Sequence, residues 1–192
     1  MGAVDVWAQI TTEHMARQDW LEPLLRWTGQ EGDPLVPSPK STLAAMDAAD
    51  VDISLLSAWH GPAGDLITNE EAGRQIETAP DRFRGLATVD LNKPMEAVRV
   101  IRDVVDGNTF VGVRVVPWLW NLPPNGRRYY PIYAACIDAG VPFCTRLVIQ
   151  GLYYARKLGG SFPTLKTFCW ISPSLLWSED MWVSRGLMNW SR

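Results

Sequence analysis

The segment FVGVRVVPWLWNLPPNGRRYYPIYAACIDAGVPFCT, residues 110–145, contains one complete unit of strand, helix and strand. Residues 110–116 are mostly β-branched and apolar, which is typical of a buried strand. Residues 131–139 are predicted to form a helix, closed by Gly140 in the position that favours glycine after a last turn. Residues 142–145 predict the second strand. Two strands joined through a helix pair in parallel.

The same alternation extends from this segment back to the N-terminus. Further strands are predicted over 3–10, 51–58 and 83–89, and further helices over 39–47, 70–77 and 93–105. Ser41 or Thr42 is expected to cap the first of these helices and Asn69 the second, while Lys93 and Pro94 open the third. This rhythm with short connections predicts an α/β protein, either a doubly wound sheet or a (β/α)8 barrel.

The overall composition favours one globular domain and excludes several classes of partner. Of 192 residues, 47% are hydrophobic and 20% charged, and the net charge of −3 comes without the clustered Lys and Arg that nucleic acids require. No apolar run is long enough to span a membrane. Cys136, Cys144 and Cys169 are odd in number and lack metal-site spacing, which favours a reducing, cytoplasmic location.

The character of the chain changes after Thr145. Residues 146–192 contain four of the ten Trp and carry six basic against two acidic residues, a net +4 against −7 for residues 1–145. A complete barrel needs about 250 residues, and three more units of about 30 residues each do not fit into this tail. We therefore expect the fold to lie in 1–145, with 146–192 poorly ordered.

Four stretches carry a resemblance to a known family: VDVWAQI at 4–10, AAMDAADVDISLLSAWHGP at 44–62, APDRFRGLATVDL at 79–91, and the segment from Gly112 to Thr145. Together they resemble the amidohydrolase-related family, the metal-dependent barrel enzymes that include aminocarboxymuconate-semialdehyde decarboxylase. The resemblance implies a partial (β/α)8 TIM-type barrel of about five strand–helix units. It also implies a parent activity as a hydrolase or carboxy-lyase on a small carboxylated metabolite.

The metal site of that family is degenerate in this sequence. The resemblance places the pattern D-x-H-x-H at the end of the first strand, where two imidazoles hold a divalent, zinc-type metal in intact relatives. Trp7 and Gln9 stand where those histidines would be. Tryptophan cannot ligate a metal, and a glutamine carbonyl is a poor zinc ligand. We therefore expect this chain to hold no metal.

The tail is consistent with a shifted reading frame. Relatives continue after the P-F-C-T segment with G-H-T-G-P, D-F-P-E-L and G-G-H motifs, none of which occurs here. When the third base of each codon is joined to the first two bases of the next, 146–152 permits V-G-H-T-G-P. Trp170 followed by Ile171 then forces the aspartate of D-F-P-E-L. We expect 146–192 to be the same message read out of frame.

Three residues are candidates for substrate binding. His60 follows the second predicted strand at the barrel mouth, where it could contact substrate, bind a metal or pack in its loop. Arg114 could hold a carboxylate bidentately or pair with a neighbouring carboxylate such as Asp90. Trp118 lies with Trp120 in the loop after the fourth predicted strand, where the two could line an apolar pocket or pack against helices.

Other polar residues receive plainer interpretations. Asp5 shares a strand face with Trp7 and Gln9 and could orient a polar network. Cys144 has no paired-histidine motif and is expected to be a buried structural thiol. His14 is expected to be an exposed or packed loop residue.

No residue is assigned a catalytic role, because the histidines that the resemblance requires are absent. We expect this chain to be inactive although its parent family is enzymatic. The rival interpretations are a non-catalytic fragment or pseudogene product, and a truncated binding protein. In either case an open sheet edge would favour homo-oligomers or aggregates.

Overall fold

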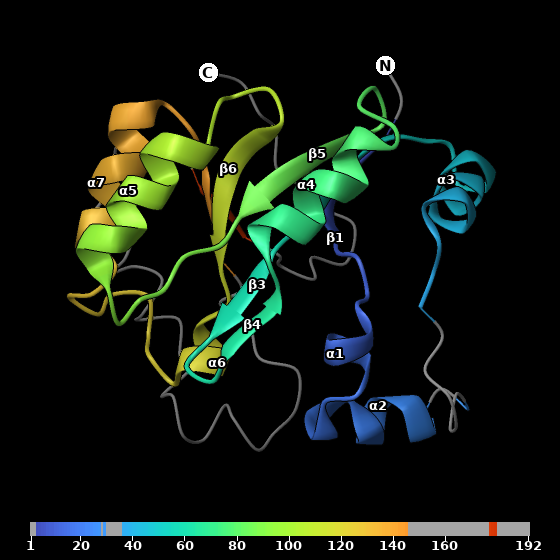
Figure 1. The fold of residues 1–192 in the computed structure, drawn as a ribbon, viewed down its shortest axis with the longest axis horizontal. Coiled ribbons are helices and arrows are strands. Elements are labelled where there is room, and N and C mark those ends of the chain that lie inside the picture. The colour runs from blue at the N-terminus through green and yellow to red at the C-terminus, as the bar shows by residue number, and fades with distance from the viewer. Residues whose placement is uncertain (1–2, 28, 30–35, 146–176, 180–192) are drawn as a thin grey trace, which may run out of the picture.

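The computed structural model describes residues 3–27, 29, 36–145 and 177–179, and its centre is a parallel β-sheet (Figure 1). The six strands lie in the order β1-β2-β5-β6-β7-β8, with every neighbouring pair parallel. Their bounds are β1 Ala3–Ala8, β2 Val51–Ser57, β5 Phe83–Ala87, β6 Phe110–Val115, β7 Phe143–Thr145 and β8 Trp177–Glu179. The α/β class and the five predicted strands are confirmed.

The short strand β8 was not predicted. It pairs with β7 through Phe143 opposite Trp177 and Thr145 opposite Glu179. The edge of a sheet offers unpaired backbone groups to any segment that can extend beside it, whatever its side-chain pattern. The rest of the predicted tail, 146–176 and 180–192, lies outside the described residues, as does the shifted frame inferred from it.

Four helices connect the strands where the sequence predicted them, at α3 Pro39–Ala48, α4 Asn69–Glu77, α5 Pro94–Val104 and α7 Tyr130–Ala139. Gly140 ends α7 in the left-handed conformation, φ 66°, as predicted. The predicted cap of α3 is wrong, because Ser38 takes that position and its hydroxyl accepts the N–H of Ser41 at 3.1 Å. Pro39 then fills the first helical position, where a missing N–H costs nothing.

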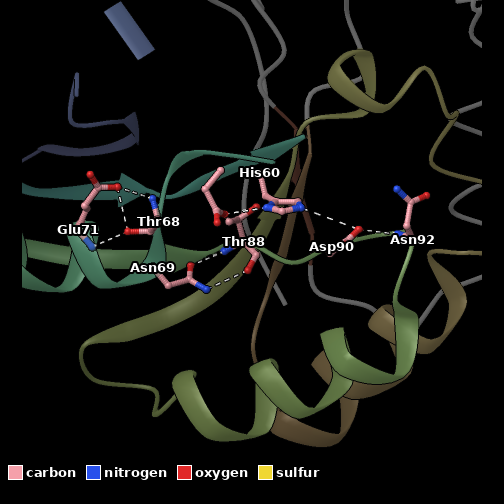
Figure 2. A network of polar contacts seen from close by, with 8 residues as sticks. His60, Thr68, Asn69, Glu71, Thr88, Asp90 and Asn92 are labelled. Atoms are coloured by element: carbon pink, nitrogen blue, oxygen red, sulfur yellow. Dashed lines mark hydrogen bonds and ion pairs between the residues drawn. The ribbon is translucent and has the colours of Figure 1, made fainter. Parts of the chain in front are cut away.

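The predicted cap of α4 is also displaced by one residue. Thr68 accepts the N–H of Glu71 at 3.0 Å, and the Glu71 carboxylate accepts the N–H of Thr68 at 2.8 Å, which completes a capping box. Asn69 instead binds the backbone of Thr88, accepting its N–H at 2.8 Å and donating to its carbonyl at 3.0 Å (Figure 2). This amide ties the start of α4 to the chain just after β5.

Several short elements were not predicted. Strands β3 Trp59–Gly61 and β4 Gly64–Ile67 form an antiparallel hairpin directly after β2. The short helices are α1 Glu13–Ala16, η1 Asp19–Leu21 and α2 Glu22–Trp27 after β1, and α6 Pro117–Trp120 after β6. No helix in the part of the chain that the structure describes is long and apolar enough to cross a bilayer.

The helices bury the sheet in two main clusters. Helices α5 and α7 lie side by side (Figure 1) and pack Ile101, Ile132 and Cys136 against Val113 and Phe143 of β6 and β7. Each large apolar side chain that is fully buried in this way contributes about 1.5–3 kcal/mol. The second cluster places Ala72 and Ile76 of α4 against β2, β5 and β6. These packed faces hold the strand ends in fixed positions.

Close packing in the second cluster depends on a glycine in β5. A Cβ at Gly85 would lie 2.5 Å from Cδ1 of Phe110 and 2.9 Å from Cδ1 of Ile76. Real Cβ atoms do not approach other heavy atoms so closely. The absent side chain is therefore what lets the Phe110 ring lie on β5 beneath α4.

The sheet is curled and open, as in part of a barrel. Arg114 of β6 donates from Nη2 to the carbonyl of Val6 in β1 at 2.5 Å, although two other strands separate β1 from β6. Only a curved sheet brings these strands into contact on its concave side. By contrast, Val4 and Val6 of β1 are 50% and 42% exposed, so the outer face of this edge strand is uncovered. The predicted partial barrel is confirmed.

Candidate functional site

The carboxyl-terminal ends of the parallel strands bring the candidate residues to one side of the sheet. Ligand sites of barrels and open α/β sheets lie at these ends, because the loops that follow the strands are free to vary. Five segments contribute to this region: the end of β1, the hairpin β3–β4, the loop after β5, the end of β6 with α6, and the end of β7.

Trp7 and Arg114 form a pair across the concave side of the sheet. The guanidinium carbon of Arg114 lies 3.8 Å from the centre of the Trp7 ring, and Nη2 binds the carbonyl of the preceding residue, Val6. Arg114 is only 1% exposed. A cation over an indole face is attracted by the ring quadrupole, and more strongly where water is excluded. Asp90, which the sequence offered as an ion-pair partner for Arg114, instead forms an ionic contact with His60.

Gln9 and Asp5 lie on either side of this pair in the sequence. The Oε1 atom of Gln9 is buried and has no hydrogen-bond partner within the described part of the chain. The side chain of Asp5 accepts the backbone N–H of Trp7 at 2.9 Å and is exposed. The β1–β2 register is irregular between Asp5 and Ala8, so strict alternation of faces does not hold there. Asp5 therefore orders the local backbone.

These residues do not fit the metal site that the family resemblance implies. An indole has no lone pair to give a metal, and the ring of Trp7 already faces the guanidinium of Arg114. Among residues 3–27, 29, 36–145 and 177–179, no group of three or more His, Cys, Asp or Glu side chains is arranged to hold a metal ion.

His60 lies between two carboxylates at the same end of the sheet (Figure 2). Its Nδ1 is 2.7 Å from Oδ1 of Asp65 across the hairpin, and its Nε2 is 3.9 Å from Oδ1 of Asp90 after β5. The ring stacks on Trp120 with centroids 5.5 Å apart. Asp90 is itself fixed, because the same Oδ1 accepts the N–H of Asn92 at 2.8 Å. These contacts fix the orientation of the imidazole between the hairpin and the loop after β5.

Trp118 belongs to a cluster of three indoles. Its ring meets Trp20 edge to face at 5.1 Å and Trp59 at 6.3 Å, and Trp20 stacks on Trp59 at 6.3 Å. The same apolar cluster includes Trp7. Because Trp59 and His60 are successive residues of β3, they point to opposite faces of the hairpin. The structure therefore groups Trp118, Trp7 and Arg114 on one side and leaves His60 on the other.

Several buried polar atoms at this end have no hydrogen-bond partner among the residues that the structure describes. They are Oε1 of Gln9 after β1, Nε1 of Trp59 in the hairpin, Nε1 of Trp120 in α6 and Oγ1 of Thr145 at the end of β7. A buried polar atom without a partner costs about 1–3 kcal/mol. Each of these atoms, on four different segments near the strand ends, is a position where a polar ligand or water could complete a hydrogen bond.

The sequence analysis missed Trp20 and Trp59 as members of this region. Trp59 carried a signal, because it adjoins His60, whereas Trp20 depends on a short helix whose position no local pattern determines. Cys144 is a buried thiol, as predicted. His14 lies exposed in α1, where its backbone carbonyl accepts a hydrogen bond from Gln18.

The comparison with protein families gives one match, to a family described as amidohydrolase, over residues 5–145. This match covers almost the whole region in which the sequence predicted a regular fold. No curated protein matches the chain.

Solved structures with a similar fold are barrels and decarboxylases. An uncharacterised TIM-barrel protein from Bordetella bronchiseptica has a TM-score of 0.68 and 19% identity, over 91% of this chain and 65% of that one. A dihydroxybenzoic acid decarboxylase from Polaromonas, with bound manganese and 2-nitroresorcinol, has a TM-score of 0.61 and 20% identity, over 93% and 64%. The 5-carboxyvanillate decarboxylase of Sphingomonas paucimobilis has a TM-score of 0.64 and 17% identity, over 92% and 66%. The chain thus spans slightly less than two thirds of each structure.

Proposed function

Because the chain belongs to the amidohydrolase family, we propose that it binds a small carboxylated molecule at the carboxyl-terminal end of its parallel sheet. The parent activity is hydrolysis or decarboxylation of such a molecule. The observation that carries the proposal is the set of buried polar atoms of Gln9, Trp59, Trp120 and Thr145 without partners at that end. A ligand that accepts from the Trp59 N–H and donates to Gln9 would satisfy two of them.

We assign substrate contacts to Arg114 and Trp118 on one side of the hairpin, and to His60 at the mouth on its other side. Arg114 supplies a buried positive charge beside Trp7, which attracts a carboxylate. The imidazole of His60, oriented by Asp65, offers a hydrogen bond at the mouth. Trp118 offers an aromatic face to a planar ligand. Two structures of similar fold are named as decarboxylases of aromatic acids, which supports a carboxylated aromatic molecule as the ligand.

We further propose that this chain does not itself catalyse a metal-dependent reaction. Trp7 and Gln9 stand at the positions of the expected ligand histidines, and the metal-dependent relatives would use a metal-bound water that these residues cannot hold. The buried thiol of Cys136 supports a reducing, cytoplasmic location.

The test is a binding and turnover assay with aromatic acids. Benzoate, 2,6-dihydroxybenzoate and 5-carboxyvanillate are titrated against the full chain while tryptophan fluorescence is followed, and product is measured with and without Mn²⁺. We expect saturable quenching by the acids, none by the neutral analogue resorcinol, and no product in either condition. Product formation that depends on Mn²⁺ would contradict the inactive chain, and failure of every acid to bind would contradict the ligand class.

Matched variants locate the binding. Trp59→Phe keeps an aromatic ring but removes the buried N–H, so affinity should fall by about tenfold, the effect of one lost hydrogen bond of about 1.4 kcal/mol. Trp27→Phe is the control, because Trp27 is 85% exposed in α2. Equal effects of the two substitutions would place the ligand elsewhere.

A second candidate function is binding without chemistry by an oligomer that covers the edge of β1. The exposed Val4 and Val6 favour it, since an uncovered apolar strand face at a sheet edge promotes association. Sedimentation velocity of the full chain and of Val6→Lys tests this candidate. A larger species that only the unsubstituted chain forms would support it, and a monomer in both would exclude it.

A further inference from the structure

The imidazole of His60 has a defined tautomer, because its two ring nitrogens face carboxylates at different distances. Nδ1 lies 2.7 Å from Oδ1 of Asp65, within hydrogen-bond reach. A carboxylate only accepts hydrogen bonds, so Nδ1 carries a proton and donates a hydrogen bond to Asp65. In the neutral ring Nε2 is then an acceptor. The hairpin of β3 and β4 thus builds a base whose lone pair is on Nε2.

The Nε2 atom faces a second acceptor at a distance that suits a bridging water (Figure 2). Oδ1 of Asp90 lies 3.9 Å away, which is too far for a direct hydrogen bond. Both atoms are acceptors while the imidazole is neutral, so a molecule that satisfies both must donate twice. Water donates twice, and one water can bridge two polar atoms at this separation. Its oxygen lone pairs stay available for bond formation.

The base and the second acceptor are held in place by their neighbours. The imidazole stacks on Trp120 with an interplanar angle of 29°. Oδ1 of Asp90 accepts the N–H of Asn92 at 2.8 Å, and the side-chain oxygen of Asn92 accepts from Arg128 at 2.5 Å. Reacting groups need such fixed positions. The side chain of His60 is 18% exposed, so the imidazole is open to solvent.

We propose that His60, with Asp65 as its positioning residue, is a metal-independent general base that hydrolyses small aryl esters at the mouth of the sheet. Nε2 removes a proton from the bridging water while the water oxygen forms a bond to the ester carbonyl carbon. When the tetrahedral intermediate collapses, the bond from that carbon to the aryl oxygen breaks, and the imidazolium returns the proton to the leaving oxygen. The products are a carboxylic acid and a phenol. Between the two proton transfers Asp65 stabilises the imidazolium.

The class of substrate follows from the groups that surround the base. An aryl ester has a stable leaving anion, so activation of a water by one base suffices. An aromatic group suits the indole of Trp120 beside the imidazole. The N–H of this indole is buried and has no partner within the described chain. A carbonyl oxygen that reaches it gains a hydrogen bond that strengthens as negative charge develops.

The experiment compares the two histidines of the sequence. Phenyl acetate and p-nitrophenyl acetate are incubated with the full chain in buffer containing EDTA, and release of the phenol is measured. His60→Gln should lower kcat by at least about 100-fold, a usual contribution of a general base. His14→Gln is the matched control and should leave the rate unchanged, because His14 is exposed in α1 and contacts Gln18 one turn away.

Two variants of Asp65 separate positioning from a merely structural role. Asp65→Asn can donate to Nδ1, which moves the ring proton to Nε2 and removes the base. Its kcat should fall nearly as far as that of His60→Gln, with KM unchanged. Asp65→Glu restores a carboxylate and should recover part of kcat. A structural role alone would change KM and stability and would give no such recovery.

The unsubstituted chain supplies the decisive measurement even where a variant fails to fold, which circular dichroism checks. Its kcat/KM should exceed the second-order rate constant of 4-methylimidazole under the same conditions, and a value no higher overturns the proposal. Equal rates for folded His60→Gln and His14→Gln also overturn it. So does a rate that EDTA abolishes, because a metal would then be required. None of these assays measures the binding of an acid, so their failure leaves the proposed ligand class untouched.

Discussion

The contact between Trp7 and Arg114 joins two strands that have no backbone hydrogen bonds with each other. Because β2 and β5 lie between β1 and β6, this side-chain contact helps to hold the curvature of the sheet. Its energy has two parts, the attraction of a cation to an aromatic face and the burial of the ring against the neighbouring apolar side chains. The two parts respond differently to substitution.

Trp7→Leu should lower the free energy of unfolding by about 1–3 kcal/mol, because it removes a cation–π contact worth about 0.5–2 kcal/mol together with some packing. Trp7→Phe keeps an aromatic face and should cost less. Urea unfolding followed by circular dichroism measures both. The matched control is Trp27→Leu, which should change stability by less than about 0.5 kcal/mol because that ring is 85% exposed. Equal costs at positions 7 and 27 would show that the contact contributes nothing.

The thiol of Cys136 should give the fold a measurable alkaline limit. Burial raises its pKa from an ordinary 9.0 to about 12, with a smaller contribution from Cys144, and burial also raises the pKa of Tyr129 and Tyr133. A pKa that is higher in the folded than in the unfolded chain gives stability that is complete below the unfolded pKa. That stability is lost as pH rises through the folded value. The free energy of unfolding should therefore fall between about pH 9 and 12.

Alkylation with iodoacetamide checks the same residue directly. At about pH 9 the unfolded thiol is half ionised whereas the folded one is not, and only the thiolate reacts. We expect the peptide containing Cys136 to be modified at least about tenfold more slowly in buffer than in urea. Equal rates would show that the side chain is accessible and its pKa ordinary.

Single residues were predictable from the sequence where the neighbouring positions determine their environment. Cys144 lies in an apolar strand, and burial followed from that pattern. The partner of Arg114 could not be predicted, since the Val6 carbonyl is 108 residues away and is reached only when the sheet curls. The position of His60 between two carboxylates depends on the hairpin and on the loop after β5, which local patterns do not determine.

At the scale of elements, the strands and helices with a clear period were predicted and the short ones were not. The apolar runs of β2, β5 and β6 and the glycine after α7 each give a strong local signal. The hairpin of β3 and β4 has only three and four residues per strand, too few to show an alternation. Helix caps were misplaced by one to four residues, because several adjacent Ser, Thr and Asn residues are chemically suitable and only the geometry chooses between them.

Two glycines that face the same phenyl ring should respond in opposite ways. Gly85→Ala places a Cβ 2.5 Å from the Phe110 ring and should destabilise the fold by about 1–3 kcal/mol. Gly73→Ala, inside α4, places its Cβ 3.8 Å from the same ring and should stabilise by about 0.5–1 kcal/mol, because alanine loses less backbone entropy in a helix. Thermal unfolding of the two variants compares them.

A double variant tests the assigned cause. Combining Gly85→Ala with Phe110→Leu removes the ring that the new methyl group meets, so its cost should be less than the sum of the two single costs. If the costs simply add, the steric explanation for Gly85 is wrong.

At the scale of the whole molecule, the described sheet is open at β1. In a closed barrel the first strand is covered on both faces, whereas Val4 and Val6 are here half exposed. The fold class was predictable, because the repeated strand–helix pattern admits few architectures. The openness was also expected, since five units cannot close a barrel of eight. The partnership of β8 with β7 was not, because residues 146–192 carry no regular pattern.

We propose that residues 146–192 arise from a shifted reading frame, and the proposal predicts the effect of repairing it. Restoring the frame after Thr145 should give a protein with higher soluble yield and a sharper thermal transition, because added strands and helices would cover the edge and outer face of β1. Both forms are expressed and compared in yield, unfolding and binding of a dye that reports exposed apolar surface.

Two outcomes would contradict the shifted frame. One is a 192-residue chain that melts as cooperatively as the repaired one and binds no more dye. The other is a genomic sequence around the codons of Thr145 and Arg146 in which no single-base insertion or deletion restores the family motifs.

The order of the strands bears on how the chain folds as it leaves the ribosome. In the parallel sheet, β2, β5, β6 and β7 each pair with the sheet strand that precedes them in the chain, beginning with β1. A newly emerged strand therefore finds its docking edge already outside the exit tunnel, and no pairing has to wait for a distant part of the chain. Translation at about 5–20 residues per second leaves seconds between successive units, far longer than local helix and hairpin formation requires. The sheet can thus grow vectorially, one strand at a time, with the growing edge always at the nascent end.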